Sequence, residues 1–186
     1  MMEKTLHIRL LAMDVDGVLT RGDVVYSNSG DEHKVFNIQD GCGIAVARHA
    51  GLMTAFITGR ESPAVERRAR ELCVDYPITG CRDKGAAIRD LLLRAGLRIE
   101  EVAFVGDDIN DILAFRECGW KVAVNNACED LKAQADHITE HRGGNGAVRE
   151  VIEMILKAQG KWAAAVDAYL KALEEADAGP DYPAHQ

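Results

Sequence analysis

No segment of the chain is apolar over the roughly 20 residues that a membrane-spanning helix requires. The short apolar stretch at residues 6–13 ends in acidic residues, and no small-residue cleavage site follows it. We therefore interpret this stretch as a core strand and not as a signal peptide. With 186 residues, the chain has the usual length of one domain with a substantial core.

Metal-binding and disulfide patterns are missing as well. The five cysteines are scattered without a C-x-x-C pair, and the six histidines have no ligand-like spacing. A structural zinc site or a disulfide framework is therefore not expected. Reduced, buried thiols in a cytoplasmic protein are expected instead.

The chain is also short of basic residues, with 22 Lys and Arg against 30 Asp and Glu and a net charge of −8. This balance argues against binding nucleic acid through a broad basic surface. An acidic protein can still bind phosphate esters when a local cation and a few well-placed basic groups are present.

What the chain does contain is an alternation of short apolar runs and helical patterns, which is typical of an α/β domain with a mainly parallel sheet. The expected strands are 6–13, 52–57, 102–105, 121–124 and 137–139. The expected helices are 43–50, 62–72, 83–95, 111–118, 128–135, 146–159 and 161–176. We expect a Rossmann-like three-layer sandwich over residues 1–160, then a C-terminal helix and a flexible tail over residues 161–186.

Residues 21–36 break this alternation. Val24, Tyr26 and Val35 are separated by polar residues around Asn28-Ser29-Gly30. This pattern predicts a β-hairpin with a tight turn.

Acidic and hydroxyl residues follow three of the expected strands. In open α/β sheets, ligands bind beyond the carboxyl ends of the strands, so these residues should meet at one edge of the sheet. Converging carboxylates repel one another unless a cation offsets them, and magnesium suits carboxylates, water and a substrate phosphate. The acidic and hydroxyl residues are Asp14, Asp16, Thr58, Asp107, Asp108 and Asp111, and Gly59 and Arg60 follow Thr58 directly.

This set of groups suits phosphoryl transfer. A carboxylate can attack phosphorus to give an aspartyl phosphate, which water then hydrolyses. A second carboxylate two residues away can protonate the leaving alcohol and later activate the water. The Thr58 hydroxyl, the Lys84 charge and backbone N–H groups near Gly17 can bind the phosphoryl oxygens.

Each feature alone has an ordinary structural explanation. Acidic pairs end many strands as caps or turn formers. Lys84 alone would be a solvated lysine beside a helix cap at Asp83, and Thr58-Gly59 alone would be a turn. Their joint occurrence in order, beyond apolar strands or at a helix start, favours the functional interpretation.

These segments resemble the four motifs of the haloacid dehalogenase superfamily of phosphatases. The resemblance implies that Asp14 is the nucleophile and Asp16 the acid/base, and that Thr58 and Lys84 bind the phosphoryl group. It also implies a Mg²⁺ ion held by the side chains of Asp14 and Asp107 and by the backbone oxygen of Asp16. Asp108 and Asp111 would support this site, Asp111 by orienting Lys84 or a metal-bound water. The matching segments are Asp14-Val-Asp16-Gly-Val, Ile57-Thr58-Gly59-Arg60, Lys84 and Gly106-Asp107-Asp108-x-Asn-Asp111.

Three segments look more narrowly like the 3-deoxy-D-manno-octulosonate 8-phosphate phosphatases, a subfamily that serves lipopolysaccharide sugar synthesis in Gram-negative bacteria. They are Phe36-Asn37-x-x-Asp40-Gly41-x-Gly43-Ile44, Thr58-Gly59-Arg60 and the Arg-Gly-Gly-Asn-Gly-Ala-Val-Arg-Glu stretch at 142–150. The similarity covers roughly residues 7–160. The substrate-binding residues expected on this basis are Asp16, Asn37, Asp40, Gly41, Gly59, Arg60, Arg68 and Lys84. Arg68 is equally consistent with an exposed helix arginine.

The substrate is expected to be a small phosphorylated sugar acid. Arg60 suits its carboxylate because a planar guanidinium can bind a carboxylate bidentately. Three positions bear on specificity. Ala45 stands where a basic residue is expected, and Arg60 and Glu71 stand where phosphatases of a nine-carbon keto acid look to have glutamate and lysine. The eight-carbon substrate is favoured, with the nine-carbon one as the alternative.

No inserted cap domain is expected, because only the hairpin lies between Asp16 and Thr58. Phosphoryl transfer benefits from water exclusion, so another element must cover the site. The hypothesis is that the hairpin packs against neighbouring subunits, and the resemblance implies a homotetramer built in this way. The loop 143–146 either cradles an anion or is a plain connector. For the tail after Gly160, the resemblance to some family members implies a segment that reaches a neighbouring active site and assists product release. An exposed amphipathic helix with a frayed end is the preferred interpretation.

A phospho-accepting signalling receiver is the rival from another class, since it is also a small α/β domain with clustered aspartates, a threonine and a lysine. Receivers place an acidic pair on the first strand and a lone acceptor later, whereas here the acceptor pair comes first. Asp16 would also supply an acid/base that a long-lived phosphorylated switch does not need. A catalytically inactive regulatory relative is the third alternative, but no motif residue is missing.

Overall fold

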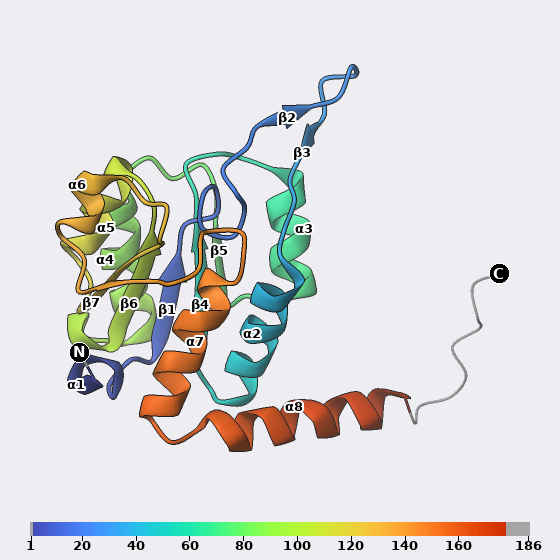
Figure 1. The fold of residues 1–186 in the computed structure, drawn as a ribbon, viewed down its shortest axis with the longest axis vertical. Coiled ribbons are helices and arrows are strands. Elements are labelled where there is room, and N and C mark those ends of the chain that lie inside the picture. Colours follow the sequence, from blue (N-terminus) through green and yellow to red (C-terminus); the bar gives the residue numbers. More distant parts are fainter. Residues whose placement is uncertain (1, 178–186) are drawn as a thin grey trace.

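A single parallel sheet forms the centre of the computed structural model, which describes residues 2–177 (Figure 1). The strand order is β5-β4-β1-β6-β7-β8, and each neighbouring pair is parallel. The end of the predicted flexible tail, residues 178–186, lies outside the described residues. The strands are β1 (Leu10–Met13), β4 (Met53–Ile57), β5 (Tyr76–Ile78), β6 (Val102–Gly106), β7 (Trp120–Ala123) and β8 (His137–Ile138).

Helices cover both faces of the sheet, which confirms the predicted three-layer Rossmann-like sandwich (Figure 1). One face carries α2 (Ile38–His49), α3 (Pro63–Glu71) and α7 (Ala147–Ala158). The other carries α4 (Lys84–Ala95), α5 (Ile112–Phe115) and α6 (Glu129–Lys132). The remaining helical elements are α1 (Met2–Thr5), the 3₁₀ turns η1 (Ile99–Glu101) and η2 (Ile109–Asp111), and α8 (Trp162–Asp177), which packs on α2 and α7.

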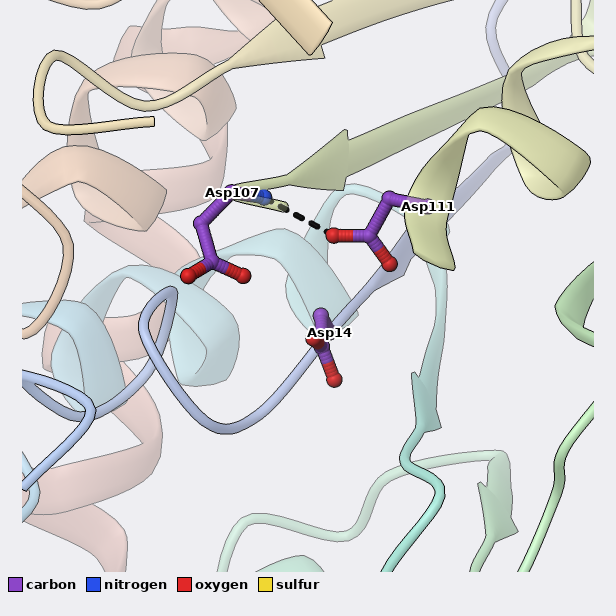
Figure 2. Close-up of side chains that lie close together, drawn as sticks. All are labelled: Asp14, Asp107 and Asp111. Atoms are coloured by element: carbon purple, nitrogen blue, oxygen red, sulfur yellow. Dashed lines mark hydrogen bonds between the residues drawn. The ribbon is translucent and has the colours of Figure 1, made fainter. Parts of the chain in front are cut away.

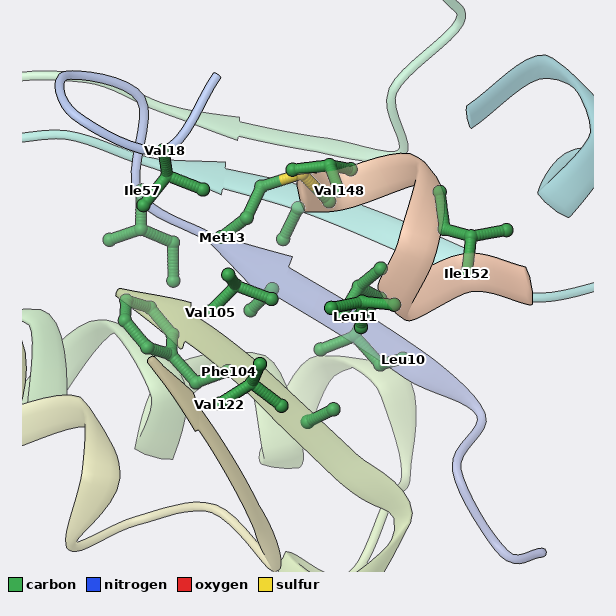
Figure 3. Packing of buried hydrophobic residues seen from close by; sticks show 14 of the residues in the cluster. Leu10, Leu11, Met13, Val18, Ile57, Phe104, Val105, Val122, Val148 and Ile152 are labelled. Atoms are coloured by element: carbon green, nitrogen blue, oxygen red, sulfur yellow. The ribbon is translucent and has the colours of Figure 1, made fainter. Parts of the chain in front are cut away.

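The core lies on both sides of β1, the strand at which the order of the sheet reverses. All four residues of β1 are buried, as expected for a parallel strand covered on both faces. Figure 3 shows β1 side chains beside those of β6 and of α7, among them Met13, Val105 and Val148. This packing fixes the strand ends from which the candidate site is built.

The hairpin predicted over residues 21–36 is present as β2 (Val25–Tyr26) and β3 (Glu32–His33), an antiparallel pair that projects from the body of the molecule (Figure 1). Backbone hydrogen bonds across its turn run from Ser27 N to Asp31 O and from Gly30 N to Ser27 O. Within residues 2–177 there is no inserted cap domain and no helix long and apolar enough to cross a membrane.

Several predicted details were wrong. The first strand begins at Leu10 instead of residue 6, and α2 begins at Ile38 instead of residue 43, because Asn37 Oδ1 accepts hydrogen bonds from the N–H groups of Gln39 and Asp40. Strand β5 was missed because it is three residues long and contains Pro77, which only an edge strand tolerates.

Helix α3 begins at Pro63, within the expected range 62–72, and the Ser62 hydroxyl makes no capping hydrogen bond. The expectation of buried cysteines needs correction. The five cysteines are free, as expected, yet only Cys118 is buried and Cys73 is exposed. The expectation that the thiols are generally buried is therefore wrong.

Candidate active site

Three strand ends deliver the predicted site residues to one edge of the sheet. The register pairs Met13 of β1 with Phe56 of β4 and with Val105 of β6. Asp14 therefore emerges between the segments that begin at Thr58 and Asp107. This point lies beside the reversal of strand order, where open α/β sheets bind ligands.

Lys84 lies between two carboxylates at the centre of this edge. Its ammonium is 2.7 Å from Asp14 Oδ2 and 2.6 Å from Asp111 Oδ1, and only 1% of its side chain is exposed. Burial opposes the charged form, but the two carboxylates raise the pKa of Lys84 above its usual value. Lys84 is therefore a buried cation and not the solvated lysine that its sequence position alone would indicate.

The three carboxylates of Asp14, Asp107 and Asp111 converge, as Figure 2 shows. One oxygen atom from each lies within 4.8 Å of the others. Burial and the charge of Asp111 raise the pKa of Asp14 to about 6, and burial and the charges of Asp14 and Asp111 raise the pKa of Asp107 to about 8. Two carboxylates that resist ionisation in this way need a neighbouring cation if both are to be charged.

The carboxylates differ in their availability to such a cation. Both oxygens of Asp111 are engaged, Oδ1 by Lys84 and Oδ2 by the backbone N–H of Asp107 at 2.8 Å. Asp107 Oδ1 is buried and has no hydrogen-bond partner within the described residues. An unpartnered oxygen on a ligand set made only of oxygens fits a hard divalent cation such as Mg²⁺. Asp111 has the position of a supporting residue, and exposed Asp108 caps η2.

The loop after β1 brings its backbone against Asp107. Gly17 has a φ of +91°, and a Cβ atom there would come within 1.9 Å of Asp107 Oδ2. Only glycine allows both the left-handed backbone and this approach. The loop thereby lets the segment containing Asp16 and the end of β6 lie side by side.

A cavity of about 280 Å³ opens at this edge. It collects most of the residues predicted from the four motifs. Thr58, which is buried, and Gly59 line it from the end of β4. Its lining residues are Asp14, Asp16, Gly22, Thr58, Gly59, Arg60, Asp107, Asp108 and Asn110.

The hairpin supplies residues to this site that the sequence interpretation missed. Lys34 Nζ lies 2.5 Å from Asp16 Oδ1, and Arg60 Nη2 lies 2.5 Å from Glu32 Oε1 and 3.2 Å from the Tyr26 hydroxyl oxygen. The charges of Lys34 and Glu32 beside a predicted turn were the available signal. No local pattern indicates which distant residue a hairpin side chain will contact.

Five predicted substrate-binding residues lie outside the lining of this cavity: Asn37, Asp40, Gly41, Arg68 and Lys84. Lys84 nevertheless contacts Asp14, which lines it. Asn37 caps α2. Gly41 lies against Arg68, which extends over the Phe36 ring and pairs with Glu71. Their contact with substrate stays a prediction.

Asp40 accepts hydrogen bonds from the backbone N–H groups of Gly146 at 3.2 Å and Arg149 at 2.8 Å. The anion at the start of α7 is thus a side chain of the protein itself. The N–H groups of Gly143 and Gly144 are also used internally, by Asn126 Oδ1 and by the carbonyl of Val18. These contacts favour a structural loop over an anion cradle.

Ala45, the position of the expected basic residue, lines a different cavity of about 170 Å³ between α2, α3 and α8. Glu71 lines the same cavity and pairs with Arg67 and Arg68. Within one chain, neither position touches the carboxylate cavity.

The parallel sheet and the aspartates at its reversal point define a haloacid dehalogenase-like hydrolase. The family model of that description matches residues 80–152, which contain Lys84 and the cluster from Asp107 to Asp111.

Comparison with similar proteins identifies the family within this class of hydrolases. The 3-deoxy-D-manno-octulosonate 8-phosphate phosphatase of Haemophilus influenzae is 40% identical over 161 residues, which are 87% of this chain and 89% of that protein. The enzyme of the same name from Escherichia coli K12 is 43% identical over 158 residues, 85% of this chain and 84% of that protein. A solved structure of the Moraxella catarrhalis enzyme, in complex with a magnesium ion, a phosphate ion and a KDO molecule, has a TM-score of 0.87 at 44% identity and covers 90% of this chain and 97% of that one. The chain belongs to the family of 3-deoxy-D-manno-octulosonate 8-phosphate phosphatases.

Proposed function

We propose that the protein hydrolyses 3-deoxy-D-manno-octulosonate 8-phosphate to the free sugar acid and phosphate, with Mg²⁺ as cofactor, as a step in lipopolysaccharide synthesis. The observation that carries this proposal is the buried Lys84 held between Asp14 and Asp111, with the unpartnered Asp107 oxygen beside them. This arrangement combines a nucleophile, a cation for the phosphoryl oxygens and a ligand for a metal ion.

In the first step, a carboxylate oxygen of Asp14 forms a bond to phosphorus, and the bond from phosphorus to the sugar oxygen breaks. Asp16, protonated, donates its proton to that leaving oxygen. In the second step, water attacks the phosphorus of the aspartyl phosphate and gives a proton to Asp16, and the bond to Asp14 breaks to release phosphate. General acid and base help of this kind contributes roughly 10²–10⁴-fold in rate.

The side chains of Asp14 and Asp107 and the backbone oxygen of Asp16 would hold the magnesium ion. When bound, Mg²⁺ neutralises charge on the phosphoryl oxygens and allows nearby carboxylates to be ionised together. Lys84 and the Thr58 hydroxyl bind the phosphoryl oxygens from the protein side. Asp111 keeps Lys84 in place through its 2.6 Å contact.

Arg60 is the residue we assign to the carboxylate of the sugar acid. It lines the cavity, and 43% of its side chain is exposed, so an entering ligand can reach it. Its planar guanidinium offers parallel donors to a carboxylate. A substrate with both a phosphate and a carboxylate would use the two ends of the site.

We further propose a homotetramer in the cytoplasm. The hairpin exposes 53% of Val24, 62% of Tyr26 and 74% of Val35, and neighbouring subunits would cover these side chains. Five free cysteines suit a reducing compartment. A fully active monomer by light scattering would contradict the assembly.

The test is phosphate release from the eight-carbon substrate, compared with a nine-carbon keto-acid phosphate and with generic sugar phosphates. Each is measured with Mg²⁺ and with a chelator, in the unchanged protein and in Asp14→Asn. We expect Mg²⁺-dependent release with preference for the eight-carbon substrate, lost in the variant. Preference for the nine-carbon compound would support the proposed phosphatase mechanism but would show that the nine-carbon keto-acid phosphate is the substrate. Release from none of them would overturn the proposal.

A further inference from the structure

Lys34 is a buried cation outside the four motifs, and it contacts the carboxylate to which we assign proton transfer. Its side chain is 3% exposed although it comes from the projecting hairpin, directly after β3. The ammonium donates to Asp16 Oδ1 at 2.5 Å and lies 3.6 Å from Glu32 Oε2. A lysine this deeply buried needs such acidic partners.

Asp16 has few other constraints on its orientation. It is followed by Gly17 in a left-handed conformation. Its Oδ2 is buried and has no hydrogen-bond partner among residues 2–177, and its Oδ1 bonds to Lys34. Lys34 therefore fixes Oδ1 of the Asp16 carboxylate, whereas Oδ2 forms no hydrogen bond within the described residues. Asp16 itself lines the cavity.

We propose that Lys34 is a positioning residue for the reaction: it holds Asp16 Oδ1 so that Oδ2 is the oxygen that exchanges a proton with the leaving group and then with water. This inference rests on the proposed function, because it requires Asp16 to be the acid/base. Proton transfer requires an oxygen held within hydrogen-bond reach of the reacting atom. Without Lys34, the carboxylate can rotate, and the correctly placed oxygen is present for only part of the time.

The nature of the leaving group separates this role from a merely structural one. A sugar alkoxide is a poor leaving group and needs a proton as the bond to phosphorus breaks. The p-nitrophenolate ion leaves without one. Loss of a positioned acid should therefore slow phosphoryl transfer from a sugar phosphate much more than transfer from p-nitrophenyl phosphate.

The experiment compares Lys34→Met with the unchanged protein in single-turnover transfer to Asp14, with Mg²⁺ and both substrates. We expect the rate with the sugar acid phosphate to fall about 30-fold or more, a fraction of the full effect of an acid. The rate with p-nitrophenyl phosphate should stay within about threefold. Lys34→Arg, which restores a donor, should recover most of the loss.

Controls separate the possible failures. His33→Gln changes the neighbouring hairpin residue and should leave both rates within about twofold. Equal losses with the two substrates in Lys34→Met, or no loss with either, would overturn the inference. If one of these outcomes is found for Lys34→Met while Asp14→Asn is inactive, only the positioning role of Lys34 is refuted and the proposed function stands. If Asp14→Asn keeps its activity, the proposed function itself fails.

Discussion

Gly143 lies directly against Gly17, so close that a Cβ atom at Gly143 would come within 1.7 Å of the Gly17 carbonyl oxygen. The contact joins the loop before α7 to the loop that carries Asp16. The hydrogen bond from Gly144 N to Val18 O, 2.8 Å long, strengthens the same junction. A glycine remote in sequence thus supports the placement of the candidate catalytic residues.

Replacing Gly143 with alanine should therefore displace the loop at Gly17 and with it the neighbouring Asp16. Backbone atoms cannot move aside as a flexible side chain can, and overpacking of this kind costs about 1–3 kcal/mol. We expect Gly143→Ala to lower the free energy of unfolding by this amount and kcat by at least about tenfold. Urea denaturation and phosphate release measure the two effects.

Gly96→Ala is the matched control. Gly96 has a φ of +62° and open space around it, so alanine there meets backbone strain of about 1–2 kcal/mol and no clash. The Gly96→Ala variant should have a lower free energy of unfolding and an unchanged kcat. Equal turnover in the two variants would show that the junction between Gly143 and Gly17 does not position the site.

Asp40 provides a second prediction, because its carboxylate bridges α2 and the start of α7. Asparagine keeps one acceptor oxygen but turns its NH₂ group toward a backbone N–H, so one hydrogen bond is lost inside the protein. We expect Asp40→Asn to reduce the free energy of unfolding by about 1–3 kcal/mol and to leave KM unchanged, since Asp40 does not line the cavity. A raised KM at unchanged stability would favour the substrate contact predicted from the sequence.

Much of the site follows from the sequence because apolar runs reveal where parallel strands end. Asp14 comes directly after such a run and Asp107 follows another one after a single glycine, and the common edge of a parallel sheet brings them together. Lys84 begins a helix, and its cap at Asp83 was also expected from the sequence. The structure confirms this cap, because Asp83 Oδ1 accepts a hydrogen bond from Ala86 N. In these cases local pattern and general topology suffice.

The parts that escaped prediction depend on contacts between distant segments. Nothing near Lys34 indicates that its ammonium reaches Asp16, because the path of the hairpin over the sheet edge decides this contact. Asp40 meets α7 across more than one hundred residues of chain for the same reason. Pattern predicts which elements form, and packing decides which side chains on irregular segments meet.

A third prediction concerns Glu32, whose carboxylate forms a salt bridge with the guanidinium of Arg60. If Arg60 binds the substrate carboxylate, Glu32 competes for the same donors. Because the pair is partly exposed, its effect is modest. We expect Glu32→Gln to lower KM for the sugar acid phosphate by about threefold and to leave KM unchanged for a sugar phosphate without a carboxylate.

Arg60→Met is the complementary variant. It should raise KM for the sugar acid phosphate by about tenfold, corresponding to one charge-assisted contact, and hardly affect the neutral sugar phosphate. If both variants change the two substrates equally, the pair between Glu32 and Arg60 holds the hairpin in place and does not recognise a carboxylate.

The last prediction concerns metal removal and pH. In the metal-free protein, the pKa of Asp107 is raised from 3.8 to about 8 by burial and by the charges of Asp14 and Asp111. Between these two values, the folded protein binds more protons than the unfolded chain, so the free energy of unfolding falls as pH rises until about pH 8. Mg²⁺ binds the ionised carboxylates and offsets this loss. Its stabilising effect should therefore be larger at pH 8 than at pH 6, by roughly 1–2 kcal/mol.

Thermal unfolding at both pH values, with saturating Mg²⁺ and with a chelator, measures this difference. In Asp107→Asn, position 107 cannot ionise, so the increment due to Mg²⁺ should be small and nearly independent of pH. Asp108→Asn, which alters the exposed neighbouring carboxylate, should retain most of the pH dependence. A larger stabilisation by Mg²⁺ at pH 6 than at pH 8 would contradict the assignment of Asp107 as a ligand, because binding would then not require its ionisation.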